Sequence, residues 1–356
     1  MTPDIPASVD NATGDGRHER WGMAEADEVV SIRKPSVNAV PDSGRIRLPG
    51  LDPDAFRHPL DRRATRTLKR LPGFDRVVAK YIEWGVERTQ YVENTASSVK
   101  VGPRQFPGIH AILRETCAIL DVPEPELYIR RGPVDAYTAG HNHPYIVLFT
   151  DLIEIMDDDE LLAVLGHEIG HVKCGHVLYG TMARIVSGAM GAGVARRSNA
   201  VVNNIAAFGL GAGLAAWSRK AELTADRAAM LAVQDPDPCV RMMMKLAGGA
   251  TRWLDQMNPA AFLEQARLLD DMAEQSRLTR FHRMRIRTTG SHPLTVERAR
   301  FFDQWLREDE PRRILDGIYA VRAGSRVCLT CVKPARPTEN FCTACGTGLA
   351  VWTTSA

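Results

Sequence analysis

The sequence lacks the features that define several large classes of protein. Its start, "MTPDIPASVDNATGDGRHER", has no basic segment followed by an apolar core, so no signal peptide is expected. A clean apolar run of about 18 residues is also missing. The nearest segment, 200–217, is rich in Ala and Gly and includes Asn203 and Asn204, which favours a buried or cleft-covering helix over a membrane span. A net charge of +2 gives no argument for a general nucleic-acid or acidic-lipid partner.

Cysteine usage excludes a further class. The chain has 7 cysteines, an odd number that is concentrated near the C-terminus, which is unlike a secreted disulfide framework. The sequence therefore indicates a reducing compartment with a local metal site. Three cysteines lie apart from this cluster and are expected to be buried thiols: Cys117, Cys174 and Cys239.

The chain divides into four segments by composition. Residues 1–50 are expected to be a disordered tail, 51–310 the main domain, 311–325 a linker and 326–350 a small metal-binding module. Apolar periodicity predicts most of the elements. We expect helices at 60–95 with a break at Pro72-Gly73, 107–122, 158–174, 218–234, 239–275 and 294–307, and strands at 126–131 and 144–150 with a short one between them.

The segment "HEIGHVKCGH" carries the main chemical signal. His167 and His171 are four residues apart, on one face of an apolar helix that Asp157 or Asp158 can cap and that Gly175 follows. Two imidazoles in this arrangement can bind one zinc ion, while Glu168 stands beside them as a general base for water. The apolar setting argues against solvated histidines, because burying them without a partner would be costly.

A catalytic zinc takes three protein ligands, and the spacing alone does not identify the third. His176 lies at the wrong offset for the metzincin pattern, so we expect it to satisfy the end of the helix. Glu222, in the helix that Ser218 is expected to cap, is a candidate ligand, and Asp226 one turn later could accept the free N–H of a ligand histidine. A solvated charged face is the competing interpretation.

Three segments together resemble the M48 metallopeptidases, the gluzincin family of HtpX-like and CAAX prenyl proteases. They are "HEIGHVKCGH", "SRKAELTADRAA" and "SHPLTVERAR", in this order. The resemblance covers roughly residues 60–310. It implies an α+β fold, mostly helical with a small antiparallel sheet, and a zinc endopeptidase with a possible part in protein quality control.

The resemblance also implies roles for individual residues. Glu222 would be the third ligand, and Asp226 would support the ligands by a hydrogen bond without binding the metal itself. His292 would donate to the oxyanion or bind the zinc as an extra ligand in a resting state, and Arg298 would hold the local structure. His292-Pro293 alone would indicate an ordinary turn. The segment before the zinc helix would be an edge strand for an antiparallel peptide, with Asp135 departing from the usual Asn. Its residues are Ala136, Tyr137 and Thr138.

The tail "CLTCVKPARPTENFCTACG" contains two CxxC pairs separated by ten residues. This spacing resembles a zinc ribbon, a closed site that needs its metal to fold. The ligands would be Cys328, Cys331, Cys342 and Cys345. Two redox pairs are the competing interpretation. We expect the ribbon to contact protein, because it has few basic residues.

The sequence thus predicts a zinc endopeptidase that acts on proteins or peptides, with one catalytic and one structural zinc. A non-catalytic zinc scaffold is the main alternative, and the intact Glu168 argues against it. A membrane-integrated protease is a third hypothesis, which the Ala/Gly-rich interval does not favour. We expect a cytoplasmic chain, at most peripheral to a membrane, with no nucleic-acid partner.

Overall fold

In the computed structural model, the chain divides into two compact units, residues 1–39 and residues 40–356. The structure describes residues 44–71, 73–83, 87–191, 210–275, 295–321, 326–327 and 334–335, all in the second unit. The disordered tail predicted for 1–50 therefore lies mostly outside the described residues. Its last part is packed, since Leu48 is fully buried and its N–H donates to the carbonyl of Ile119 at 2.8 Å.

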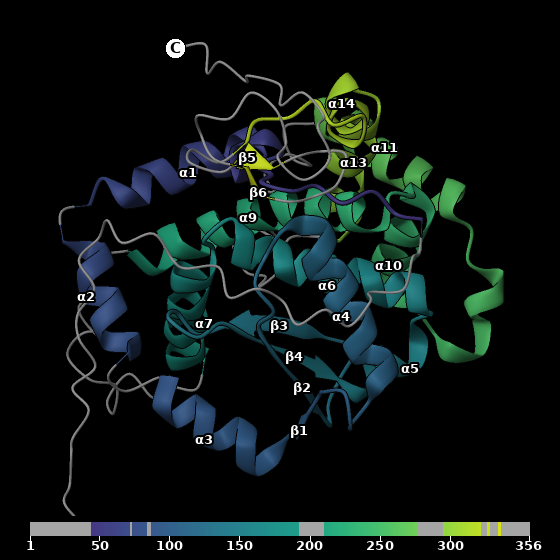
Figure 1. The fold of residues 1–356 in the computed structure, drawn as a ribbon. Coiled ribbons are helices and arrows are strands. Elements are labelled where there is room, and N and C mark those ends of the chain that lie inside the picture. Colours follow the sequence, from purple (N-terminus) through teal and green to yellow (C-terminus); the bar gives the residue numbers. More distant parts are fainter. Residues whose placement is uncertain are drawn as a thin grey trace, which may run out of the picture. The chain divides into compact units, whose positions relative to one another are not determined.

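Most of the described chain is helical (Figure 1). The helices, with two short 3-10 turns, are η1 (Pro53–Ala55), α1 (Pro59–Lys69), α2 (Phe74–Tyr81), α3 (Glu87–Ser97), α4 (Pro107–Leu120), α5 (Thr150–Ile155), α6 (Asp158–Lys173), α7 (Val177–Gly191), α9 (Leu210–Val233), α10 (Pro236–Gly248), η4 (Thr251–Gln256), α11 (Pro259–Gln275), α13 (Thr295–Leu306) and α14 (Asp309–Leu315). The strands are β1 (Val99–Lys100), β2 (Glu126–Arg130), β3 (Ala136–Ala139), β4 (Tyr145–Phe149), β5 (Arg326–Val327) and β6 (Pro334–Ala335). Helices α1 and α2 lie on either side of the predicted break at Pro72-Gly73, and α3 begins separately at Glu87. The predicted segment 239–275 is divided into α10, η4 and α11, and α9 begins earlier than predicted; the remaining predicted helices and strands are confirmed.

The larger sheet has the order β1-β2-β4-β3. Strand β2 pairs in parallel with β4, with Tyr128 opposite Val147, whereas β3 pairs antiparallel with β4. The prediction of an antiparallel sheet is therefore wrong, and the sheet is mixed. Parallel neighbours need a crossover connection, which is usually a helix, but here β3 and its turn bring the chain from the end of β2 back to the start of β4. This order leaves β3 as an edge strand.

Alternation along the strands gives the sheet two faces. Leu127, Ile129 and Ile146 point into the main core with α4 and α6, whereas Tyr128 and Val147 belong to a smaller cluster on the other face. A third cluster joins α1, α2, α7 and α9 around Trp217. Helix α6 thus lies between the sheet and α9, and it is buried on nearly all sides (Figure 1).

The ends of α6 and α9 have different local causes. Asp157 caps α6 in a capping box with Glu160, and Gly175 follows the helix with a φ of 66°. The predicted cap Ser218 is wrong, because α9 begins at Leu210 and runs through Ser218. Tertiary packing of Trp217, 2% exposed, accounts for the extra turns. No described helix is long and apolar enough to cross a membrane.

The segment expected to be a linker, 311–325, packs on the core as far as Val321. Helix α14 buries Ile314, and Tyr319 donates its hydroxyl hydrogen to the carbonyl of Pro49 at 3.1 Å. Leu51 and Val321 form an antiparallel bridge. This part of the segment therefore belongs to the main core. The division into a peptidase domain and a separate ribbon stays a prediction, since most of residues 322–356 lie outside the described residues.

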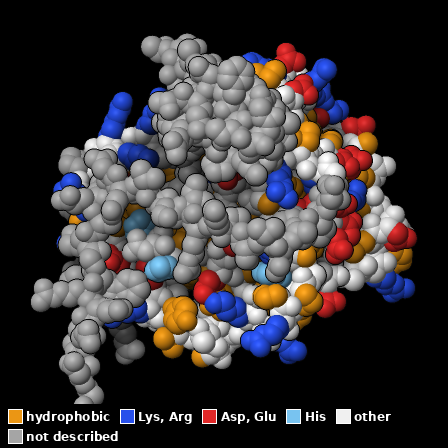
Figure 2. Space-filling model, in the orientation of Figure 1, with side chains coloured by type: hydrophobic (Ala, Val, Ile, Leu, Met, Phe, Trp, Pro, Cys, Tyr) orange, Lys and Arg blue, Asp and Glu red, His pale blue; other side chains and the backbone are white. Residues whose placement is uncertain are grey.

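Acidic and basic side chains are interspersed over the visible part of the described surface (Figure 2). The arrangement agrees with the near-neutral balance of the whole chain, which has a formal net charge of +2.

Candidate metal centre

Two glycines let α6 and α9 approach closely. A Cβ atom added at Gly166 would lie 2.8 Å from the Cβ of Ala232, and one added at Gly170 would lie 2.5 Å from the Cβ of Ala228. Both distances are well below ordinary carbon contacts of about 3.5–4.0 Å. Small residues on both helices therefore set the helix separation, and that separation determines how near Glu222 comes to the histidines.

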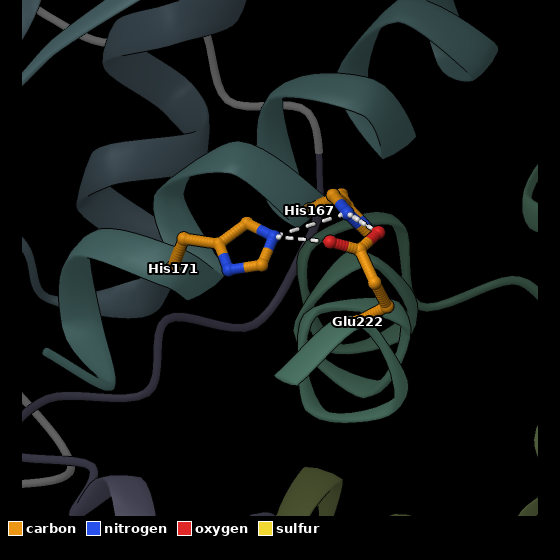
Figure 3. Close-up of side chains that lie close together, drawn as sticks. All are labelled: His167, His171 and Glu222. Carbon is orange, nitrogen blue, oxygen red and sulfur yellow. Dashed lines mark hydrogen bonds and ion pairs between the residues drawn. The ribbon is translucent and has the colours of Figure 1, made fainter. Parts of the chain in front are cut away.

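The three predicted ligands converge at this crossing (Figure 3). His167 Nε2 lies 3.2 Å from Glu222 Oε2, and His171 Nε2 lies 3.5 Å from Glu222 Oε1. The two Nε2 atoms are 3.3 Å apart. The ligand atoms all lie within 4.8 Å of one another, and this is the metal-type cluster found among the described residues. Two imidazoles and a carboxylate are the donor set of catalytic zinc sites, so the residues fit the metal.

Burial and charge act strongly on these groups. Burial, which by itself lowers the pKa of His167, is outweighed by hydrogen bonds to Asp226 and Glu222, and the pKa is raised to about 9. Burial would raise the pKa of Glu222, but hydrogen bonds to His167 and His171 hold it well below its usual value. The cluster thus attracts positive charge, which a proton or a metal cation can supply.

A buried carboxylate and guanidinium stand behind His167. Asp226 Oδ1 lies 3.0 Å from His167 Nδ1, and Arg298 Nε donates to Asp226 Oδ2 at 2.9 Å. Burial would raise the pKa of Asp226, but Arg298 and His167 lower it. The structure therefore brings Asp226 and Arg298 together beside His167.

Glu168 is not part of this three-residue cluster, and its carboxylate contacts β3. The hydroxyl of Thr138 donates to Glu168 Oε2 at 2.6 Å, and both residues are buried. The carboxylate is thus held by a residue of the expected substrate strand, and β3 meets α6 at this bond. Sequence reasoning placed Thr138 in the strand but missed this contact.

His176 and Asp61 are polar residues near the site whose contacts the sequence did not reveal. The backbone N–H of His176 donates to the carbonyl of His171 at 2.9 Å, so His176 does satisfy the helix end as predicted. Its side chain also contacts His171 and Asp61, at 3.1 Å and 3.0 Å. Burial lowers the pKa of His176 to about 4 despite the bond to Asp61.

Several predicted site residues lie outside the described residues. They are His292 and the ribbon cysteines Cys328, Cys331, Cys342 and Cys345. The other three cysteines are buried free thiols, as predicted, and burial raises the pKa of Cys174 to about 12.

Comparisons with known proteins agree with this site. The family model described as "Peptidase family M48" matches residues 103–306. The chain is 40% identical over 293 residues to "Plastoglobule-localized metallopeptidase 48, chloroplastic" of Arabidopsis thaliana, covering 80% of each protein. It is 29% identical over 180 residues to "Protease HtpX homolog" of Moorella thermoacetica, covering 43% of this chain and 59% of that protein. It is also 29% identical over 178 residues to "Protease HtpX homolog 2" of Methanosarcina mazei, covering 43% and 60%. No solved structure matches the chain.

The domain is mostly helical, and its buried helix presents two histidines to a carboxylate on a second helix. Together with the family match and the named relatives, this arrangement identifies a metalloprotease. The chain belongs to peptidase family M48. The cytoplasmic location expected from the sequence is contradicted by the Arabidopsis relative, whose name places it in the chloroplast at plastoglobules. That expectation rested on the cysteine usage, the start of the sequence and the Ala/Gly-rich interval, none of which determines where a chain resides.

Proposed function

We propose that the protein is a zinc-dependent endopeptidase in which Glu168 is the general base. The observation that carries the proposal is the division of labour at α6. His167 and His171 face Glu222 on α9, whereas Glu168 is held by Thr138 on β3. Ligands and base thus come from one helix, and two different neighbours fix their directions.

Each residue then has a defined task. Zinc, when bound, polarises water and the scissile carbonyl. Glu168 takes the proton from the attacking water and later gives it to the leaving amine. The Thr138 hydroxyl occupies Oε2 of Glu168 and leaves Oε1 for the proton. Asp226 accepts from His167 Nδ1–H, which turns the Nε2 lone pair toward the metal, and Arg298 fixes Asp226. His292 is proposed to donate to the oxyanion of the tetrahedral intermediate.

The edge strand β3 is the proposed docking site for an extended peptide. Ala136, Tyr137 and Thr138 would pair with substrate backbone, as in β-augmentation. The guanidinium of Arg184, on α7, donates to the carbonyl of Thr138, and it stacks 4.9 Å from the centre of the Tyr137 ring. A substrate that pairs at Thr138 would therefore share this carbonyl with Arg184 or displace its guanidinium.

The remaining parts of the proposal rest on the sequence. A second, structural zinc held by the four C-terminal cysteines, Cys328, Cys331, Cys342 and Cys345, is proposed from the CxxC spacing. A part in protein quality control stays a prediction. The zinc-scaffold alternative gives no reason for a buried carboxylate that is held beside the ligands, and we do not favour it.

The test compares wild type with Glu168→Gln. Both chains should contain the same amount of zinc, and the variant should hydrolyse an unstructured peptide about 10²- to 10⁴-fold more slowly or worse, because a general base is lost and no ligand is. Glu154→Gln, at an exposed position of α5, is the matched control and should keep wild-type turnover. Wild-type turnover by Glu168→Gln would exclude this mechanism, whereas absence of turnover in the wild type itself would favour the scaffold hypothesis.

A further inference from the structure

The two ligand histidines are supported in different ways. His167 has the carboxylate of Asp226 at its Nδ1 atom. His171 has another imidazole there, since its Nδ1 lies 3.1 Å from Nδ1 of His176. Nε2 of His176 in turn lies 3.0 Å from Oδ2 of Asp61. A line of polar groups therefore runs from the metal site to α1.

Asp61 is the fixed end of this line. Its side chain is fully buried, and it accepts from Thr65 at 2.8 Å and from Thr224 at 2.7 Å. Arg57 lies 3.1 Å from its Oδ2 atom. The surrounding donors come from α1, from the turn before it and from α9, the helix that carries Glu222. A buried carboxylate with this many donors is held in one position and remains charged.

Proton accounting gives the direction of each bond. A metal on His171 Nε2 requires that its Nδ1 carries the hydrogen, so Nδ1–H must donate. His176 Nδ1 must then accept, which leaves the hydrogen of His176 on Nε2, pointed at Asp61. Arg57 Nη1, 3.2 Å from His176 Nε2, then directs its hydrogen to Asp61. The opposite tautomer of His176 would place a hydrogen on His171 Nε2 and block the metal.

We propose that His176 and Asp61 are positioning residues, which hold His171 in its metal-binding tautomer and ring orientation through the relay His171–His176–Asp61. The inference rests on the proposed zinc site. It extends the site to α1, which precedes the residues 103–306 that match the family model. Helix-end satisfaction alone does not explain the side chain, because the backbone N–H of His176 already performs it.

A matched pair of variants separates positioning from packing. His176→Phe keeps a ring against Trp217, whose centroid lies 5.6 Å from that of His176, but it removes the acceptor. His176→Asn loses the ring but places an amide oxygen near the position of Nδ1. Zinc affinity of the full chain is measured by chelator competition, and His171→Ala gives the background from any other zinc that the chain binds. The unfolding midpoint of each chelated chain is measured in parallel.

Loss of an outer partner of a metal ligand costs about 10- to 100-fold in metal affinity, so we expect this loss for His176→Phe. His176→Asn should bind zinc more tightly than His176→Phe, even if its chelated form is the less stable of the two. A merely structural role would make affinity follow stability. Equal zinc affinities of wild type and His176→Phe, or equal losses in both variants, would overturn the proposal.

A second variant, at the other end of the relay, tests the proposal even if the His176 variants fail to fold. Asp61→Asn keeps the shape but removes the charge, so it should weaken zinc binding on its own. Added to His176→Phe, it should cause no further loss, because the relay is already broken. Wild-type affinity of Asp61→Asn would overturn the proposal by itself. If wild type and His171→Ala bind equal zinc, the metal site itself fails, which is distinguishable from failure of the relay.

Discussion

The close contact of α6 with α9 gives the sharpest quantitative prediction. In Gly170→Ala the new Cβ would lie 2.5 Å from the Cβ of Ala228. Ordinary carbon contacts are about 3.5–4.0 Å, so the helices must separate locally by about 1 Å. Metal–ligand distances tolerate only about ±0.2 Å. Since the histidines are on α6 and Glu222 is on α9, the separation opens the ligand set.

Overpacking of this kind typically costs about 1–3 kcal/mol. In the metal-free chain the helices can relax, so the cost falls on zinc binding, which must pull them together again. The expected loss of zinc affinity is therefore roughly 5- to 150-fold. Chelator competition measures it, and urea unfolding of the chelated chain measures any strain that remains.

Two further chains control this experiment. Gly170→Ala combined with Ala228→Gly moves one methyl group across the interface and should restore most of the zinc affinity. Gly180→Ala, on α7, meets no atom within 4 Å and should bind zinc like wild type. Wild-type zinc affinity of Gly170→Ala, or failure of the compensating change to restore any affinity, would refute the role of the glycine contact.

Three other predictions follow from described contacts. Thr138→Val should leave zinc content unchanged but slow peptide hydrolysis by roughly tenfold or more, because Glu168 loses a charge-assisted hydrogen bond, and Thr138→Ser should retain activity; equal rates for both would contradict this. Burial and Arg227 lower the pKa of His58 to about 4, and its neutral Nδ1 caps α1. Between pH 7.5 and pH 5 the unfolded state takes up a proton on His58 before the folded state does, so acidification destabilises the fold. The chelated wild type should therefore lose about 2 kcal/mol more stability over this range than chelated His58→Asn. A chain that ends after α13 should have a free energy of unfolding lower by about 3 kcal/mol or more, since it loses buried Ile314 and Tyr319; unchanged stability would restore the linker prediction.

Local patterns were the part of the fold that the sequence determined well. The capping box at Asp157, Gly175 and the apolar period located α6, because these signals act within a few residues. The 3.6-residue period also put His167 and His171 on one face. The direction of β2 relative to β4 could not be read in the same way, because alternation along a strand does not encode the direction of its neighbour.

Contacts between distant segments were the part that the sequence did not reveal. The spacing alone did not decide whether Glu222 is a metal ligand, since an acidic residue on a charged helix has the same pattern whether it binds metal or faces water. The packing of Gly166 and Gly170 on alanines of α9 brings the two helices together and so places Glu222 near the histidines. Asp61 is 115 residues from His176, and no local signal connects them. Thr138, a β-branched strand residue, gave no sign that its hydroxyl holds Glu168.

Zinc-edge anomalous diffraction from crystals of the zinc-loaded full chain tests the central claim most directly. The account predicts an anomalous peak between α6 and α9, about 2.0–2.2 Å from Nε2 of His167, Nε2 of His171 and a carboxylate oxygen of Glu222. Glu168 should lie outside this ligand set, with its bond to Thr138 intact. Absence of a peak at this crossing, or a metal bound by Glu168 in place of Glu222, would contradict the account.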